Sequence, residues 1–124
     1  MSNWTADELD RIGTADKLRI APRNADGSLR PYTTIWVVRV GDDLYVRSYR
    51  GRRGSWFRHA MQRHEGRIQA GGLDRDVTFE EPSGANHDSI NQAYRTKYAH
   101  HSRSYVDPMV SPDATTATLR LIRR

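Results

Sequence analysis

The chain of 124 residues contains no cysteine. Disulfide bonds, thiolate metal sites and cysteine nucleophiles are therefore excluded. Long apolar runs are also missing: the longest, Ile35 to Val38, is far shorter than the roughly 20 residues that a membrane crossing needs. The first residues, Met1 to Trp4, have neither the basic start nor the apolar run of a secretory signal. We therefore expect a cytoplasmic protein with no membrane segment.

Apolar residues are scarce as well, at 36% of the chain, and the mean hydropathy is −0.83. A chain of this length has room for one domain with a modest core, so we expect a single domain over residues 1–124. A subunit interface can complete such a core, and Trp4 and Trp36 are candidates for the buried surface. The composition therefore favours a homodimer.

The net charge of +5 is concentrated in one segment. Residues 47–67 hold seven arginines and the single acid Glu65, which gives this segment +6 and leaves −1 for the rest of the chain. Charge that is localised in this way predicts a local anionic partner rather than general adhesion to nucleic acid.

The sequence pattern predicts an α+β fold. Thr5 to Glu8 has the form of a capping box, which predicts a short helix over residues 5–12. Alternating or β-branched runs predict six short strands, and apolar residues at helical spacing predict two further helices. Strands that are mostly joined by hairpins favour an antiparallel sheet or closed barrel with helices at its edges. The expected strands are 17–23, 32–40, 44–49, 67–70, 73–80 and 115–122, with helices at 55–64 and from 86, and an irregular segment at 102–113.

The residues with most chemical potential lie where a strand, a basic loop and a helix follow one another, between residues 45 and 56. The first turn of the helix offers free N–H groups and the positive end of a dipole. Gly51 and Gly54 allow close approach of the backbone, Ser48 and Ser55 add hydroxyl donors, and guanidinium groups suit bidentate contacts with phosphate. This segment predicts a site for a phosphorylated or otherwise anionic small molecule.

The order of elements around this loop resembles the split β-barrel of flavin- and deazaflavin-dependent oxidoreductases, above all the small deazaflavin-dependent nitroreductases. In that family a strand pair leads into a Ser/Lys/Gly loop, and a Trp-Tyr pair then opens a helix. Here Arg50-Gly51 takes the place of Lys-Gly, and Trp56-Phe57 takes the place of the aromatic pair. The resemblance runs from about residue 17 to the C-terminus. The chain as a whole also resembles a family of unknown function that is grouped near these barrels.

The resemblance implies a small split β-barrel of about six mostly antiparallel strands with flanking helices. It also implies a deazaflavin or FMN cofactor, with its phosphate on the basic loop and its ring over the strands, and oxidoreductase activity on a small organic substrate. Tyr105 would line the substrate side and donate a proton. His59, which stands where the family has Asn, would face the pocket. The implied cofactor cradle consists of Arg47, Ser48, Arg50, Gly51, Arg52, Arg53 and Trp56.

Three other interpretations remain open at this point. One is a cofactor-free enzyme or ligand-binding protein that uses the same basic loop for an anionic metabolite. Another is a solvated loop whose arginines pair with nearby aspartates. A third is a nucleic-acid or protein adaptor, which the sequence disfavours because Trp56 and Phe57 lie where the helix needs its apolar face. The histidine spacing matches no metal-binding motif, so no metal site is expected.

Overall fold

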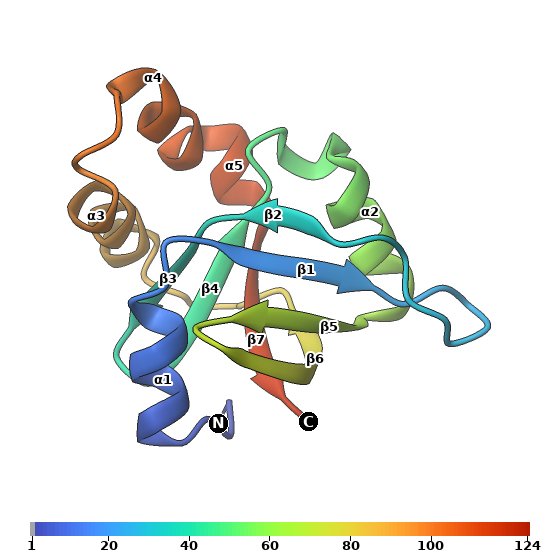
Figure 1. The fold of residues 1–124 in the computed structure, drawn as a ribbon. Coiled ribbons are helices and arrows are strands. Elements are labelled where there is room, and N and C mark those ends of the chain that lie inside the picture. Colours follow the sequence, from blue (N-terminus) through green and yellow to red (C-terminus); the bar gives the residue numbers. More distant parts are fainter. Residues whose placement is uncertain (1) are drawn as a thin grey trace.

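The computed structural model describes residues 2–124, which form a seven-stranded antiparallel sheet and five α-helices (Figure 1). The elements are α1 (Ala6–Gly13), β1 (Leu18–Pro22), β2 (Thr33–Ile35), β3 (Val37–Val40), β4 (Asp43–Arg47), the 3₁₀ turn η1 (Gly51–Arg53), α2 (Ser55–Arg63), β5 (Glu65–Ala70), β6 (Leu73–Glu80), α3 (His87–Lys97), α4 (Arg103–Val106), η2 (Asp107–Val110), α5 (Pro112–Thr116) and β7 (Thr118–Arg123).

The strand order is β2-β1-β5-β6-β7-β4-β3, and the sheet curls into a nearly closed barrel. The α+β split-barrel prediction is confirmed, with seven strands where about six were expected. The difference arises at Trp36, which interrupts the expected strand 32–40. The part before Trp36 pairs with β1 and the part after it pairs with β4, so the chain crosses there from one edge of the sheet to the other.

Two apolar clusters lie on opposite faces of β3 and β4. Because successive strand residues point to opposite faces, Val37 and Val46 face the barrel interior while Val38 and Tyr45 face α3. Leu9 and Ile12 of α1 and Phe57 and Ala60 of α2 complete the barrel core. The second cluster joins α3 to the segment after it, through Ile90, Tyr94, Tyr98, Val106 and Met109.

The starts of α1 and α2 are capped differently. The capping box predicted for α1 is present, because Thr5 Oγ1 accepts from the Glu8 N–H and Glu8 accepts from the Thr5 N–H. The N-cap of α2 is Gly54, and no side chain caps that helix.

The segment expected to be irregular holds α4, η2 and α5 instead, and it buries Val106, Met109 and Ala114. Among residues 2–124, none of the helices combines the length and the apolar composition that a membrane crossing requires.

Candidate functional site

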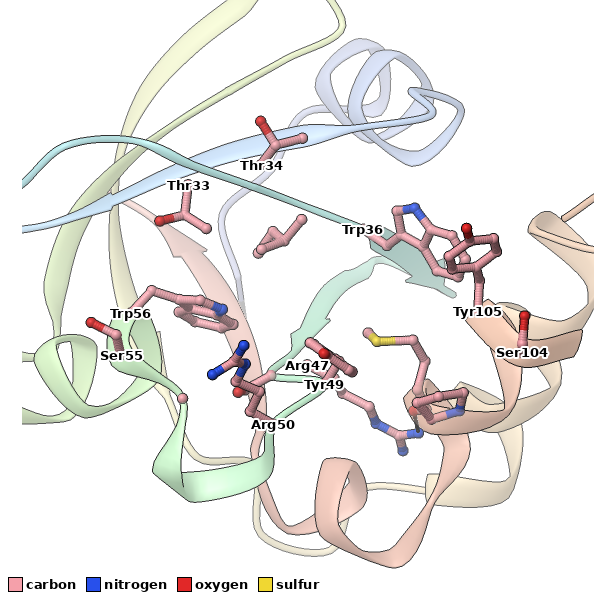
Figure 2. A pocket seen from close by; sticks show the side chains of 15 residues that line it. Thr33, Thr34, Trp36, Arg47, Tyr49, Arg50, Ser55, Trp56, Ser104 and Tyr105 are labelled. Carbon is pink, nitrogen blue, oxygen red and sulfur yellow. Dashed lines mark hydrogen bonds between the residues drawn. The ribbon is translucent and has the colours of Figure 1, made fainter. Parts of the chain in front are cut away.

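A cleft of about 660 Å³ opens between β2, the end of β4, the start of α2 and the α4–η2 segment (Figure 2). It lies at the split of the barrel, where the edge strand β2 faces the loop that follows β4. Figure 2 shows Thr33 and Thr34 along one side, Ser55 and Trp56 at one end, and Tyr105 at the other. Its volume falls in the range of ordinary small-molecule sites, about 300–1,000 Å³.

Aromatic side chains form much of the cleft wall: Trp36, Tyr49, Trp56 and Tyr105 all line it. Tyr49 and Tyr105 are 59% and 66% exposed, and they are the exposed large hydrophobic side chains of the described chain. Trp56 also packs on the barrel core and meets Phe57 edge to face, with ring centroids 6.0 Å apart. Such walls suit a flat ring, because aromatic faces pack well in offset or stacked geometry.

Trp36 is held in place by Tyr98 at the end of α3. The two rings are parallel within 4°, with centroids 3.9 Å apart. The Tyr98 hydroxyl accepts from the Val37 N–H at 3.2 Å and donates to the Asp16 carbonyl at 2.8 Å. Burial raises the pKa of Tyr98, so the hydroxyl keeps its proton. The crossing between β2 and β3 is therefore anchored from the helix.

Arg47, the first residue of the predicted cradle, is fully buried beside the cleft. Its guanidinium donates to Thr118 Oγ1 at 2.9 Å, to the Met109 carbonyl at 3.0 Å and to Asn91 Oδ1. Burial lowers the pKa of Arg47, and among residues 2–124 no carboxylate pairs with it. The side chain points away from Arg50 and ties β4 to β7, α3 and η2 (Figure 2).

Arg50 is the guanidinium that remains available to a ligand in the cleft. Its side chain is exposed, lines the cleft and extends toward Trp56 (Figure 2). It lies 5.9 Å from the Tyr49 ring centroid, and within residues 2–124 it makes no ion pair. The first turn of α2, which has no acidic residue and no side-chain cap, begins close by.

The remaining basic residues of the loop turn elsewhere. Arg52 pairs with Glu81, donates to the Thr116 carbonyl at 2.8 Å and lies over the Phe57 ring. Arg53 is exposed and does not line the cleft. The expected pairing of the loop arginines with nearby aspartates is therefore not seen: Arg52 pairs with a glutamate instead, and within residues 2–124 Arg50 makes no ion pair.

Gly51 and Gly54 shape the loop around Ser48. Gly51 is buried with φ +68°, and a Cβ there would lie 3.2 Å from Asp113. A Cβ on Gly54 would lie 2.2 Å from Ser48 Oγ, and Ser48 and Gly54 both line the cleft. Any larger residue at these positions would move the loop or the serine hydroxyl.

The two catalytic candidates end up in different places. Tyr105 lies at the cleft edge, whereas His59 is half-buried on α2, does not line the cleft and has its Nδ1 2.7 Å from the Ser55 carbonyl. The structure thus brings together only part of the predicted set. Those that line the cleft are Arg47, Ser48, Arg50, Trp56 and Tyr105, and those that do not are Gly51, Arg52, Arg53 and His59.

Several lining residues were not predicted as site residues. Thr33 and Thr34 reach the cleft only because the barrel closes, and nothing local in the sequence marks them. Met109 lies in a segment expected to be irregular, and Trp36 was assigned to a subunit interface. Trp4, assigned to the same interface, packs on the barrel core and donates to the Leu121 carbonyl at 2.9 Å.

The arrangement can bind a flat, largely apolar ring that carries an anionic group. The aromatic walls provide the ring surface, and Arg50 with the start of α2 provides the positive charge. Within residues 2–124 there is no group of three or more His, Asp or Glu side chains that could hold a metal ion.

Solved structures with the same fold include flavin-, deazaflavin- and haem-related proteins. An F420 reductase aligns with a TM-score of 0.59 and 9% identity over 94% of this chain and 90% of its own. A FAD-binding protein from Mesorhizobium loti aligns with a TM-score of 0.58 and 17% identity over 98% and 91%. The haem storage protein HutZ from Vibrio cholerae aligns with a TM-score of 0.63 and 11% identity over 96% and 89%. At these identities the likeness establishes the fold alone.

Sequence comparison assigns the chain to a family. Residues 8–121 match the family described as "Uncharacterized protein conserved in bacteria (DUF2255)". None of the curated proteins matches the chain.

Proposed function

We propose that this chain, which belongs to the bacterial family DUF2255, binds a flavin or deazaflavin in the cleft and acts as an oxidoreductase on a small organic substrate. The observation that carries the proposal is the combination of four aromatic residues with one exposed arginine, Arg50, in a single cleft of suitable size; within residues 2–124 Arg50 makes no ion pair. The cofactor supplies the redox chemistry, and the protein supplies orientation, charge and exclusion of water.

The lining residues fit the two parts of such a cofactor. Arg50 and the first N–H groups of α2 would hold a phosphate, because both present positive charge at the same edge of the cleft. Trp36 and Trp56 would contact the ring system. Tyr105, exposed at the other end, would then meet the substrate. The buried Arg47 would act through the wall that it supports rather than by touching the phosphate.

Haem fits the lining less well, although the fold also occurs in a haem storage protein. Haem iron is held in proteins by histidine, by cysteine thiolate, by methionine together with histidine, or by tyrosine. The chain has no cysteine, and of the residues that line the cleft none is a histidine. Of these ligand types the lining offers Tyr49, Tyr105 and Met109 but no histidine to pair with the methionine, so the donor set favours an organic ring cofactor.

Titration of the purified protein with riboflavin, FMN, FAD and the deazaflavin cofactor tests the proposal. Quenching of tryptophan fluorescence reports binding, and the variants Trp36→Phe and Trp56→Phe locate the quenched residues. We expect at least one phosphorylated cofactor to bind in the micromolar range, and riboflavin to bind about tenfold more weakly or worse because it has no phosphate. No binding of any of the four below millimolar concentration would overturn the proposal.

Arg50→Ala and Arg53→Ala form a matched pair for this titration. Both side chains are exposed on one loop, but only Arg50 lines the cleft. Loss of charge-assisted hydrogen bonds costs about 1.5–3 kcal/mol, so Arg50→Ala should weaken phosphate-dependent binding about 10- to 100-fold. Arg53→Ala should leave it within about twofold. Equal effects of both changes would place the phosphate elsewhere.

Binding of a phosphorylated metabolite without any flavin is the second candidate, and the unpaired Arg50 supports it equally. A thermal-shift screen with phosphorylated metabolites separates the two, since a ligand that binds only the folded state raises the melting temperature. A homodimer remains a prediction, and sedimentation equilibrium of the purified chain tests it directly.

A further inference from the structure

Lysine is almost absent from this basic chain, which has 18 arginines but only Lys17 and Lys97. The two lysines have different surroundings. Lys17 is exposed in the connection before β1, whereas Lys97 is the half-buried last residue of α3. Lys17 therefore serves as an internal control for chemistry that depends on the surroundings of a lysine amine.

The Lys97 amine is enclosed by a backbone carbonyl and an aromatic ring. Its Nζ donates to the Val37 carbonyl at 2.6 Å and lies 5.2 Å from the centroid of the Tyr98 ring. Within residues 2–124 no carboxylate forms an ion pair with it, and Asp16 is the acidic group that acts on it from a distance. The carbonyl and the ring offset part of the cost of burying this ammonium, but no paired carboxylate neutralises it, so burial still disfavours the charged form.

The proton on this amine is held correspondingly weakly. Burial lowers the pKa of Lys97 to about 8, and the Asp16 carboxylate offsets that effect only in part. At pH 7 an amine with such a pKa is neutral in about one molecule in ten, against roughly one in 2,500 for an ordinary lysine. A neutral amine is the nucleophilic form, and desolvation is a known way of activating a lysine.

Lys97 is also connected to the cleft through hydrogen bonds to the backbone of a single residue, Val37. Its Nζ donates to the Val37 carbonyl, and the hydroxyl of the neighbouring Tyr98 accepts from the Val37 N–H. The Tyr98 ring stacks on Trp36. All three contacts act where the chain crosses from β2 to β3. A change at the Lys97 nitrogen therefore reaches Trp36, which lines the cleft.

We propose that Lys97 is a site of acylation by small acyl phosphates, and that acylation shifts Trp36 in the cleft. In this step the neutral Nζ attacks the carbonyl carbon of the acyl phosphate and forms an amide bond. The carbon–oxygen bond to phosphate breaks, phosphate leaves with the electron pair, and the amine proton passes to solvent. The product has no charge and one N–H in place of three donors, with an acyl group to accommodate beside Val37.

Reaction of the whole chain with acetyl phosphate tests the first part. Peptide mass spectrometry gives the ratio of acetylation at Lys97 to that at Lys17, at pH 7 and at pH 10.5. We expect Lys97 to lead by about tenfold or more at pH 7, and the lead to shrink strongly at pH 10.5, where the neutral form of an ordinary lysine amine is also abundant. Equal labelling at pH 7, or faster labelling of Lys17, overturns the proposal.

The indole N–H signals in an NMR spectrum test the second part. The chain has three tryptophans, and Trp36→Phe identifies the signal of Trp36. Acetylation at Lys97, or the substitution Lys97→Gln, should move that signal and leave the signal of Trp4 in place. Lys97→Arg, which keeps the charge, and Lys17→Gln should both leave the Trp36 signal unmoved. An unmoved Trp36 signal in both the acetylated protein and Lys97→Gln contradicts the coupling, and neither result depends on a bound flavin.

Discussion

Replacement of Arg47 by methionine separates two roles that the sequence alone combined. As a cofactor ligand, Arg47 would contribute to affinity and little to stability. In the structure its guanidinium is buried and joins β4 to Thr118, Met109 and Asn91. Methionine keeps the apolar stem but removes every donor. The change therefore measures the structural contribution of the guanidinium almost in isolation.

The size of the effect follows from what remains after the change. Four acceptors, Thr118 Oγ1, the Met109 carbonyl, Asn91 Oδ1 and His87 Nδ1, lose a donor, at about 1–3 kcal/mol for each that stays unsatisfied. Release of a buried guanidinium that has no paired carboxylate offsets part of this loss. We expect a net destabilisation of about 3 kcal/mol, a large fraction of the 5–15 kcal/mol of a typical domain.

Urea unfolding monitored by circular dichroism provides the assay. Arg47→Met should lower the midpoint while the slope against urea stays the same. Arg50→Met, at an exposed position of the same loop, should change the free energy of unfolding by about 0.5 kcal/mol or less. If Arg47→Met unfolds like the unaltered chain and yet loses flavin binding, Arg47 contacts the cofactor directly and does not act by supporting the cleft wall.

Three further predictions concern the stability of the fold. Burial raises the pKa of Glu8, but hydrogen bonds from the Thr5 N–H, Arg75 and Arg123 have a larger effect in the opposite direction. Together these effects lower the pKa from its ordinary 4.5 to about 2. This stabilisation is therefore complete above about pH 5 and lost as the pH falls toward 2. Glu8→Gln should cost up to about 3 kcal/mol at pH 7 and almost nothing at pH 2, in urea unfolding at both values; an equal cost at both would contradict the assignment. Gly51→Ala should cost about 1–2 kcal/mol because of its positive φ, and a neutral effect in thermal unfolding would show that the loop relaxes freely. Trp56→Ala should cost about 2 kcal/mol, less than a fully buried tryptophan, and no loss of melting temperature would place that ring in solvent.

Local signals predicted most of the elements. The capping box fixed the start of α1, and alternation located β6 to the residue. The break at Trp36 was out of reach, because it depends on which strands lie at the two edges of the closed sheet. The short helices after Ser102 were also missed, since their stability comes from the burial of Val106 and Met109 rather than from local propensity.

The sequence predicts where the candidate site lies, but not which residues form it. The sequence predicts that the neighbouring arginines of this loop form one cofactor site. In the structure their side chains point in different directions, because they belong to separate elements. Arg47 is on a strand and points into a protein layer, Arg50 follows the strand and faces the cleft, and Arg52 meets a glutamate 29 positions along the chain. The residues of β2 that complete the cleft come from closure of the barrel, which no local pattern contains.

A crystal structure of the protein with its tightest-binding flavin or deazaflavin tests the central claim most directly. The proposal requires the ring system in the cleft, in contact with Trp36 and Trp56, and the phosphate within hydrogen-bonding distance of Arg50 and the first turn of α2. A ring bound outside this cleft, for example in the groove beside Lys17 and Arg19, would contradict it.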